Sequence, residues 1–212
     1  SDWYKNEIIY MFYVDQFGVV QKDKKNSFKD TAQMLDYLKD LGVTTLYMLP
    51  FAKSPMKDSG FDVQDPKNVR EDLGGLDEFN SFVKQAKKEG FKIKADLVLN
   101  HLSQEHEWFK KLESGDETKL EYFVYTDTMP QYKKYNDEKL GTVVEYTQAD
   151  GTISKRRLIF PQSVDNHYRK ITINNKDYYL YHTFYPFQLD INWNNPEVLY
   201  YELETISHWA NL

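Results

Sequence analysis

Polar side chains follow three apolar runs in the first half of the chain, at residues 15–17 (Asp-Gln-Phe), 59–62 (Ser-Gly-Phe-Asp) and 100–101 (Asn-His). Carboxylate, amide and imidazole groups hydrogen-bond hydroxyl groups. A phenylalanine in a polar loop offers a flat face on which a sugar ring can pack. Taken singly, each cluster also has a purely structural interpretation. Residues 59–62 would then belong to a solvated acidic loop, and residues 100–101 to a strand-end turn with a satisfied core histidine.

Several other chemistries are disfavoured by the residue types and their spacing. The chain has no cysteine, which removes disulfides, thiolate metal ligands and a thiol nucleophile. His101 and His106 are five residues apart, whereas two ligands on one helical face need a spacing of four. No Gly-x-Ser-x-Gly elbow or phosphate-binding loop occurs. The basic run 155–157 indicates a solvated strand edge.

The composition favours a soluble globular protein. Of the 212 residues, 41% are hydrophobic and 28% are charged, and the net charge of -6 argues against a nucleic-acid partner. No apolar run reaches the ~18–20 residues that span a bilayer. The N-terminal residues lack a signal-peptide pattern. A cytoplasmic location is favoured, and secretion requires that a signal was removed; the oligomeric state is not fixed by the sequence.

The first hundred residues alternate strand-like and helix-like patterns. Strands are expected at 8–12, 43–49 and 91–99, and a helix is expected around 79–86 before Gly90. Another helix is expected after Ser27, with Asp30 completing a capping box and Gly42 ending it. Its apolar face is formed by Met34, Leu35, Leu38 and Leu41. This order predicts a parallel sheet with crossover helices.

The pattern changes between about residues 102 and 187. A short helix is expected at 105–112, and short strands are expected at 142–147, 158–160, 171–173 and 178–181. Asp150-Gly151 and Asn174-Asn175 are typical hairpin turns. The segment therefore predicts a small, irregular, β-rich subdomain.

A last helix is expected from Pro196, with Asn195 as its N-cap. The residues expected on its apolar face are Val198, Leu199, Leu203, Ile206 and Ala210.

These elements predict an α/β fold, the N-terminal part of a (β/α)8 barrel with about three βα units. Residues 1–101 would supply three strands and two helices, 102–187 an inserted domain, and 188–212 the return to the barrel. A complete barrel takes about 250 residues. We therefore expect the chain to be part of a longer protein that continues beyond residue 212.

Three segments together resemble the α-amylase superfamily of glycoside hydrolases. Residues 96–101, Asp-Leu-Val-Leu-Asn-His, are similar to the family motif Asp-x-x-x-Asn-His. Residues 60–62, Gly-Phe-Asp, are similar to its Gly-Tyr-Asp, and residues 188–192, Gln-Leu-Asp-Ile-Asn, to the Gln-Pro-Asp-Leu-Asn that ends its domain B. The resemblance covers nearly the whole chain and points to the amylosucrase, trehalose-synthase and oligo-1,6-glucosidase branches.

The resemblance implies substrate-binding roles for three residues. His101 would hydrogen-bond the sugar in subsite −1 near its 6-hydroxyl, Phe61 would stack on the same ring, and Asp62 would hold the hydroxyls at its far edge and pair with an arginine. Such contacts suit a reaction with an oxocarbenium-like transition state, because the −1 ring must be held and distorted.

The resemblance also implies a set of supporting residues. Asp96 and Asn100 would brace the end of the third strand, and Gln188 and Asp190 would support the site from the end of domain B. Asn100 is a calcium ligand in many family members, and it is the only candidate metal ligand here. We expect no metal or other cofactor.

Departures from the family pattern bear on these roles. Phe61 replaces the usual tyrosine, and Gln16 replaces a common arginine. The calcium loop of the oligo-1,6-glucosidases is missing from residues 15–28. The family's nucleophile, general acid and stabilising aspartate lie beyond the segments matched here, so no catalytic residue is expected within the 212 residues.

The resemblance implies a retaining α-glucosidase or transglucosylase that acts on maltose-, sucrose- or trehalose-like sugars and short α-glucans. The 212 residues by themselves would be inactive. The alternatives are a catalytically inactive barrel that binds sugar or serves as a scaffold subunit, and an unrelated α/β domain. Neither a nucleic acid nor a membrane is an expected partner.

Overall fold

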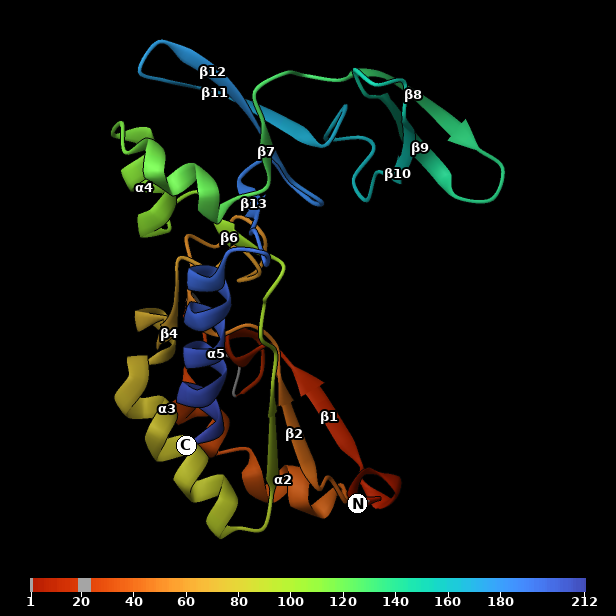
Figure 1. Ribbon diagram of the computed structural model, residues 1–212. Coiled ribbons are helices and arrows are strands. Elements are labelled where there is room, and N and C mark those ends of the chain that lie inside the picture. The colour runs from red at the N-terminus through yellow and green to blue at the C-terminus, as the bar shows by residue number, and fades with distance from the viewer. Residues whose placement is uncertain (1, 19–23) are drawn as a thin grey trace. The chain divides into compact units, whose positions relative to one another are not determined.

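A computed structural model describes residues 2–18 and 24–212. The chain forms two compact units (Figure 1). The first contains the residues up to Val98 together with Leu203–Leu212, and the second contains Leu99–Glu202.

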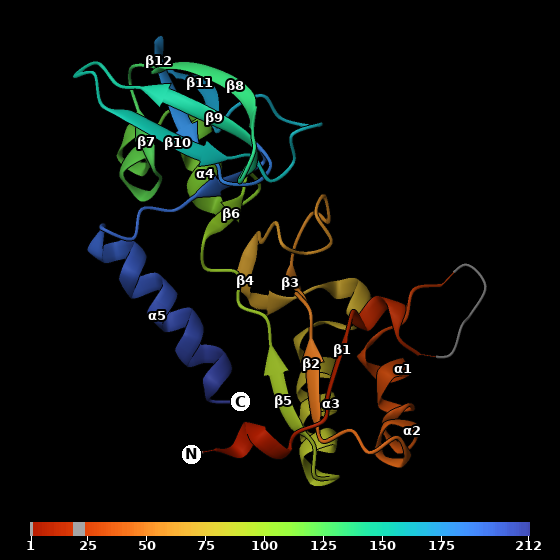
Figure 2. The same cartoon turned by 90° about the vertical axis from the view of Figure 1, so that its right-hand side faces the viewer.

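A three-stranded parallel sheet forms the centre of the first unit. It consists of β1 (Ile9–Phe12), β2 (Thr45–Met48) and β5 (Lys92–Ala95), in the order β1-β2-β5 (Figure 2). Leu46 of β2 pairs with Tyr10 on one side and with Ile93 on the other. The predicted parallel sheet is therefore confirmed, although each strand is shorter than its apolar run.

Three helices accompany this sheet: α1 (Phe28–Ala32), α2 (Leu35–Asp40) and α3 (Gly75–Lys88). The predicted capping box is confirmed, because the Ser27 amide donates to the Asp30 carboxylate at 2.8 Å. The single helix expected after it is wrong. The amides of Gln33 and Met34 bond to carbonyls three residues back, which breaks the helix between α1 and α2. Leu41 lies beyond α2 and is 54% exposed.

The core of the first unit is rich in phenylalanine. The side chain of Phe28 is fully buried and packs edge-on against Phe51 and Phe79, with ring centroids 6.0 and 5.3 Å apart. The helix predicted around 79–86 is confirmed as α3. One face of this helix is buried and consists of Phe79, Phe82, Val83 and Ala86. Each buried phenylalanine contributes about 1.5–3 kcal/mol to folding.

Two further strands frame the loop that follows β2. They are β3 (Ala52–Lys53) and β4 (Asp65–Val69), and they pair antiparallel. The sequence predicted a long loop here and did not predict these two short strands. Pairing at its base instead holds residues 54–64 as a closed projection.

The second unit consists mainly of antiparallel strands. One sheet has the order β10-β9-β8, another β11-β12-β7, and β13 pairs with β6. The strands are β6 (His101–Ser103), β7 (Tyr125–Thr126), β8 (Gln131–Asp137), β9 (Gly141–Thr147), β10 (Ile153–Arg157), β11 (Tyr168–Ile173), β12 (Lys176–Tyr181) and β13 (Gln188–Asp190). The helix α4 (Glu107–Glu113) lies close to its predicted position.

Both predicted hairpin turns are confirmed. Asp150-Gly151 lies in the connection from β9 to β10, and Asn174-Asn175 forms the two-residue turn between β11 and β12. The strand expected at 158–160 is wrong. The nearest strand is β10, which pairs with β9 and ends at Arg157. Leu158 follows this strand and is buried. Strand β8 was not predicted, because its face is made of exposed lysine, tyrosine and asparagine rather than apolar residues.

The last helix, α5 (Pro196–Ala210), begins as predicted, since the Asn195 side chain accepts from the Glu197 amide at 3.0 Å. The predicted apolar face is wrong apart from Val198. Leu199, Leu203, Ile206 and Ala210 are exposed, whereas Val198, Glu202 and Thr205 are buried. Trp209 fixes the rotation of the last turns in the first unit. Its indole donates to the Pro66 carbonyl at 2.8 Å, and its ring lies edge-on to Phe51 and Phe79.

The remaining helical turns are of the 3-10 type, at Trp3–Asn6, Val14–Gln16, Glu71–Leu73 and Glu117–Tyr122. Within the described ranges, no helix has both the length and the apolar character needed to cross a bilayer.

Candidate functional site

Asp62 anchors the projecting loop of the first unit. Its side chain is fully buried, and its carboxylate accepts hydrogen bonds from the Ser54 hydroxyl (3.1 Å) and from the amides of Lys57 (2.9 Å) and Asp58 (3.0 Å). Charge-assisted bonds of this kind are among the stronger ones in proteins. The loop is thus tied to one carboxylate at its base.

The backbone of this loop is unusual next to Phe61. Met56, Ser59 and Gly60 all have positive φ, of 60°, 51° and 93°. A Cβ atom on Gly60 would lie 2.9 Å from the Pro50 carbonyl oxygen, so only glycine fits there. Phe61 itself is half-buried, and its amide donates to the Asp58 carbonyl at 2.9 Å. Residues held in sparsely populated conformations gather at functional sites.

A buried arginine joins the segments after β1 and β4. The guanidinium of Arg70 lies 2.6 Å from Asp72 and 3.5 Å from Asp15, and both Arg70 and Asp15 are buried. The Arg70 guanidinium lowers the pKa of the Asp72 carboxyl group. The sequence motifs singled out Asp15 but missed Arg70, because nothing in the sequence pairs the two residues. Asp62 bonds to the loop and not to this arginine.

Asp96 contacts the neighbouring strand. The hydroxyl of Tyr47 on β2 donates to its carboxylate at 3.1 Å. Burial raises the pKa of the Tyr47 phenol, and the hydrogen bond to Asp96 raises it further. Asp96 also marks the end of the ladder, because its amide bonds to the carbonyl of Met48, the last residue of β2.

The strand predicted at 91–99 is shorter than expected, so Asn100 and His101 do not follow directly from it. Strand β5 ends at Ala95, since its partner β2 offers no further carbonyl beyond Met48. His101 instead begins β6 in the second unit and lies opposite Asp190 of β13. The motif 96–101 is therefore shared between the two units.

His101, Asn100 and Asp190 form a cluster in the second unit, in which His101 and Asp190 are buried and Asn100 is exposed. The amide nitrogen Nδ2 of Asn100 lies 3.2 Å from Nδ1 of His101 and 3.3 Å from Oδ1 of Asp190. An amide nitrogen can only donate, so Nδ1 of His101 is the acceptor and Nε2 carries the proton of the neutral ring. Asp190 also accepts from the amide and hydroxyl of Thr183. Burial raises the pKa of Asp190, and the bonds from Thr183 and Asn100 oppose that shift.

An aromatic segment precedes Asp190. The ring of Phe184 meets His101 edge-on, with centroids 5.3 Å apart. Gln188 is fully buried, and its side-chain oxygen accepts from the Tyr185 amide at 3.3 Å. Phe184 and Thr183 were not among the predicted site residues. Their position just before the motif at 188–192 was the available signal.

The candidate residues thus fall into two groups. The first unit holds Phe61, Asp62 and Asp96, although Asp96 lies on the sheet and the other two in the loop. The second unit brings His101, Asn100, Gln188 and Asp190 together around the β6–β13 pair.

Asn100 was the one predicted candidate for a calcium ligand. Among residues 2–18 and 24–212, no three His, Asp or Glu side chains gather closely enough to hold a metal ion. Calcium takes about six to eight oxygen ligands, and the carboxylate beside Asn100 is already bonded to Thr183. We derive no step through calcium. Of segment 15–28, where a calcium loop was expected to be missing, residues 19–23 lie outside the described part.

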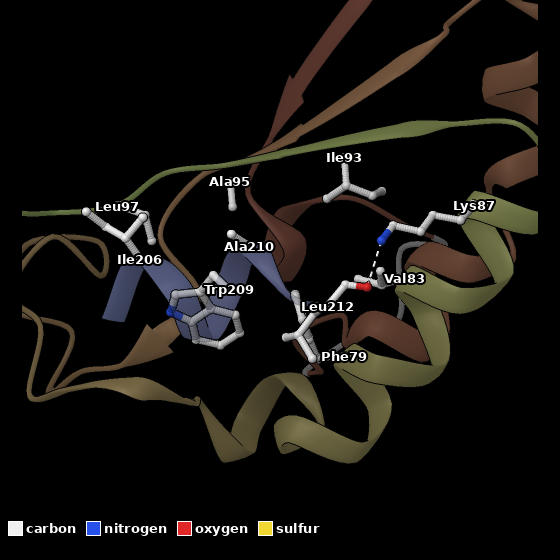
Figure 3. Close-up of a pocket in the computed structure, with 10 residues that line it drawn as sticks. All are labelled: Phe79, Val83, Lys87, Ile93, Ala95, Leu97, Ile206, Trp209, Ala210 and Leu212. Atoms are coloured by element: carbon white, nitrogen blue, oxygen red, sulfur yellow. Dashed lines mark hydrogen bonds between the residues drawn. The ribbon is translucent and has the colours of Figure 1, made fainter. Parts of the chain in front are cut away.

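A pocket of about 310 Å³ lies in the first unit between α3, β5 and the end of α5 (Figure 3). Its wall is mostly apolar, and the Lys87 ammonium bonds to the Leu212 carbonyl at its edge at 2.7 Å. None of the candidate site residues lines it, so we regard it as a gap in packing rather than as the site.

Parallel strands, a loop-borne Gly-Phe-Asp and an Asn-His at the start of a β-rich unit are features of the α-amylase catalytic domain. The model of the α-amylase catalytic domain matches residues 11–211 of this chain. The chain belongs to that family.

Curated relatives include a trehalose synthase of Thermus thermophilus, 31% identical over 210 residues, which are 99% of this chain and 19% of that protein. A trehalose-6-phosphate hydrolase of Escherichia coli is 29% identical over 99% of this chain and 34% of its own length. An oligo-1,6-glucosidase of Parageobacillus thermoglucosidasius is 28% identical over 99% of this chain and 33% of its own length. The chain spans about a third or less of the length of these relatives.

Solved structures confirm the fold. A trehalose-6-phosphate hydrolase of Bacillus licheniformis superposes with a TM-score of 0.78 at 24% identity, over 100% of this chain and 34% of that one. An α-glucosyl transfer enzyme, XgtA, superposes with a TM-score of 0.77 at 25% identity, over 100% and 35%. The predicted family is confirmed, and so are the trehalose-synthase and oligo-1,6-glucosidase likenesses.

Proposed function

We propose that this chain supplies the sugar-holding part of a retaining α-glucosidase or transglucosylase. Its substrates would be α-glucosides of the maltose, sucrose or trehalose kind and short α-glucans. Relatives named as trehalose synthase and oligo-1,6-glucosidase support this class of small-sugar substrate. In this proposal no cofactor, nucleic acid or membrane takes part.

The observation that carries the proposal is the state in which His101 is held. Donation from Asn100 to Nδ1 leaves a neutral imidazole with a proton on Nε2. A neutral N–H donor suits the hydroxyl of a sugar. Asn100 is itself oriented by the buried Asp190 carboxylate, which helps to hold the His101 ring in place.

The loop of Asp62 supplies the second part of the proposed site. Three hydrogen bonds from the loop to the Asp62 carboxylate hold the backbone of the neighbouring Phe61 in place. The ring of Phe61 would stack on the −1 sugar, and Asp62 would act mainly by holding the loop that carries this ring. The pairing of Asp62 with an arginine is not needed for that role.

The reaction would follow the two-step retaining course. One carboxylate attacks the anomeric carbon while a second protonates the leaving oxygen, and an acceptor then releases the sugar with retained configuration. We place both carboxylates outside the 212 residues, so the chain alone would be inactive. Its residues would hold the −1 ring while that ring flattens toward the transition state.

Proton NMR of the complete parent protein with maltose, sucrose and trehalose, taken in turn, tests the proposal. The α-anomer of released glucose, or an α-linked transfer product, is expected to appear before mutarotation. With sucrose, whose only glucose unit is the transferred one, initial release of β-glucose would contradict a retaining mechanism. Saturable sugar binding without any turnover would support the inactive scaffold instead.

A further inference from the structure

A second pocket lies wholly within the second unit and has a different character. Its volume is about 360 Å³, within the range of about 300–1,000 Å³ usual for small-molecule sites. It takes no side chain from Phe61, Asp62 or His101. Its wall is formed by Val124, Tyr146, Gln148, Ser154, Arg156, Tyr168, Tyr181 and Asp190.

Strand geometry explains why these side chains converge. Ser154 and Arg156 are two residues apart on β10, so both point to the same face of their sheet. Tyr146 on β9 is paired with Ser154 and shares that face. On the other sheet, Tyr168 of β11 and Tyr181 of β12 lie directly opposite each other. The two sheets bear the labels β8–β10 and β11–β12 in Figure 1.

Three tyrosine rings form the aromatic part of the wall. Tyr168 meets Tyr146 and Tyr181 edge-on, at centroid distances of 5.3 and 5.4 Å. The Tyr146 hydroxyl is fixed by His167, lying 2.7 Å from its amide and 2.8 Å from its Nδ1. The other ring nitrogen of His167 lies 2.9 Å from the Arg157 carbonyl, which completes a closed network. This part of the wall is therefore already in place without a ligand.

The polar part of the wall has hydrogen-bonding capacity to spare. Within the part of the chain that the structure describes, the side chains of Gln148 and Ser154 and the hydroxyl of Tyr168 have no hydrogen-bond partner. Arg156 interacts with the Tyr181 hydroxyl and, among the same described residues, forms no ion pair. Hydroxyl, amide and guanidinium groups around aromatic rings are the groups that hold a polyhydroxylated ring.

We propose that this pocket binds a neutral sugar beside the His101–Asn100–Asp190 cluster, with which it shares only Asp190. Arg156 and Asp190 carry opposite charges, so the wall has no excess charge that would select a phosphate. Since the pocket lies between two sheets of the inserted unit, a bound sugar would hold those sheets together. This inference does not depend on turnover by the parent protein.

The test uses saturation-transfer NMR with maltose as the probe and the parent protein in an H101A background. That background slows maltose turnover during the measurement, and because both arginine variants leave the proposed catalytic site unaltered, a difference between them reports on the pocket. Arg156→Ala is compared with Arg157→Ala, a matched control on the same strand that points to the opposite face. R156A is expected to raise the Kd for maltose about tenfold, as for the loss of a hydrogen bond to a charged group. R157A is expected to leave the Kd unchanged.

Tyr168→Phe provides a second variant, because it removes only the hydroxyl and keeps the ring. It is expected to weaken binding several-fold with an unchanged far-UV spectrum. Equal maltose affinity in R156A and R157A would overturn the proposal. So would the lack of saturable maltose signals, or binding of glucose 6-phosphate alone.

Discussion

The amide nitrogen of Asn100 lies 3.3 Å from a carboxylate oxygen of Asp190, ninety positions further along the chain. The next residue, His101, pairs across the β6–β13 ladder with Asp190 itself. The first and last strands of the second unit, β6 and β13, therefore lie side by side. The proposed sugar-binding histidine lies on this pair of strands.

Asp190→Ala is predicted to destabilise the second unit by about 2–4 kcal/mol. The change removes the buried acceptor of three donors, the amide and hydroxyl of the half-buried Thr183 and the side-chain amide of the exposed Asn100. Asp190→Asn keeps one acceptor oxygen and is predicted to cost less. Urea unfolding followed by circular dichroism measures both. Equal stability of D190A and the unaltered protein would show that the hydrogen bonds to Asp190 do not stabilise the second unit.

Phe61→Ala is predicted to lower activity steeply while the melting temperature moves little. The loop keeps its shape through Asp62 and the Phe61 backbone, so the ring is not needed to form it. Phe61→Tyr keeps the flat face, and its activity is predicted to stay within a few-fold. Kinetics and thermal melts on the same preparations decide the question. A loss of about 3–5 kcal/mol in stability with intact kinetics would identify Phe61 as a core residue.

Substitutions of Asn175, in the turn between β11 and β12, are predicted to change the stability of the fold by different amounts. Asn174 and Asn175 have φ of 48° and 64°, a left-handed conformation that alanine resists. We expect N175A to unfold about 1 kcal/mol more easily than N175G in urea. Asn174→Gly is the informative neighbour. It would lose the bonds from Asn174 to the Gly115 carbonyl and to Glu117, and would therefore gain nothing.

Glu7 gives the first unit a defined dependence on acid. Hydrogen bonds from Lys92, then Thr45 and Thr44, lower its pKa from 4.5 to about 2. A carboxylate with a lowered pKa stabilises the fold above its unfolded pKa and loses that effect as the pH falls through its folded pKa. The melting temperature of Glu7→Gln is thus predicted to lie below that of the unaltered protein by a constant amount above about pH 5. The gap is predicted to close between pH 5 and pH 2, and a gap that widens with acid would contradict the assignment.

Local signals were read correctly where a few neighbouring residues decide the structure. Ser27 with Asp30, Asn195 before Pro196 and the Asn174-Asn175 turn each bond within their own segment. The rotation of α5 could not be read in this way. It depends on Trp209 reaching Pro66, which lies 143 positions away.

The candidate site shows the same limit. Motif similarity selected His101, Asn100 and Asp190, but their hydrogen-bond order depends on pairing between β6 and β13. Arg70 and Phe184 have no local pattern that marks them. Their positions are known only from the folded structure, in which Arg70 lies beside Asp15 and Phe184 lies beside His101.

The most direct test of the proposed function is kcat/KM for maltose and trehalose in the parent protein carrying His101→Ala. Loss of a donor that acts on the transition state is predicted to cost about 2–4 kcal/mol, roughly a hundred- to thousandfold in rate, with KM changing less than kcat. Thermal melts establish that the variant is folded, and His101→Asn, which keeps an N–H donor, is predicted to recover part of the rate. A folded H101A variant that turns over sugar at the unaltered rate would show that His101 is a structural histidine and would contradict the account.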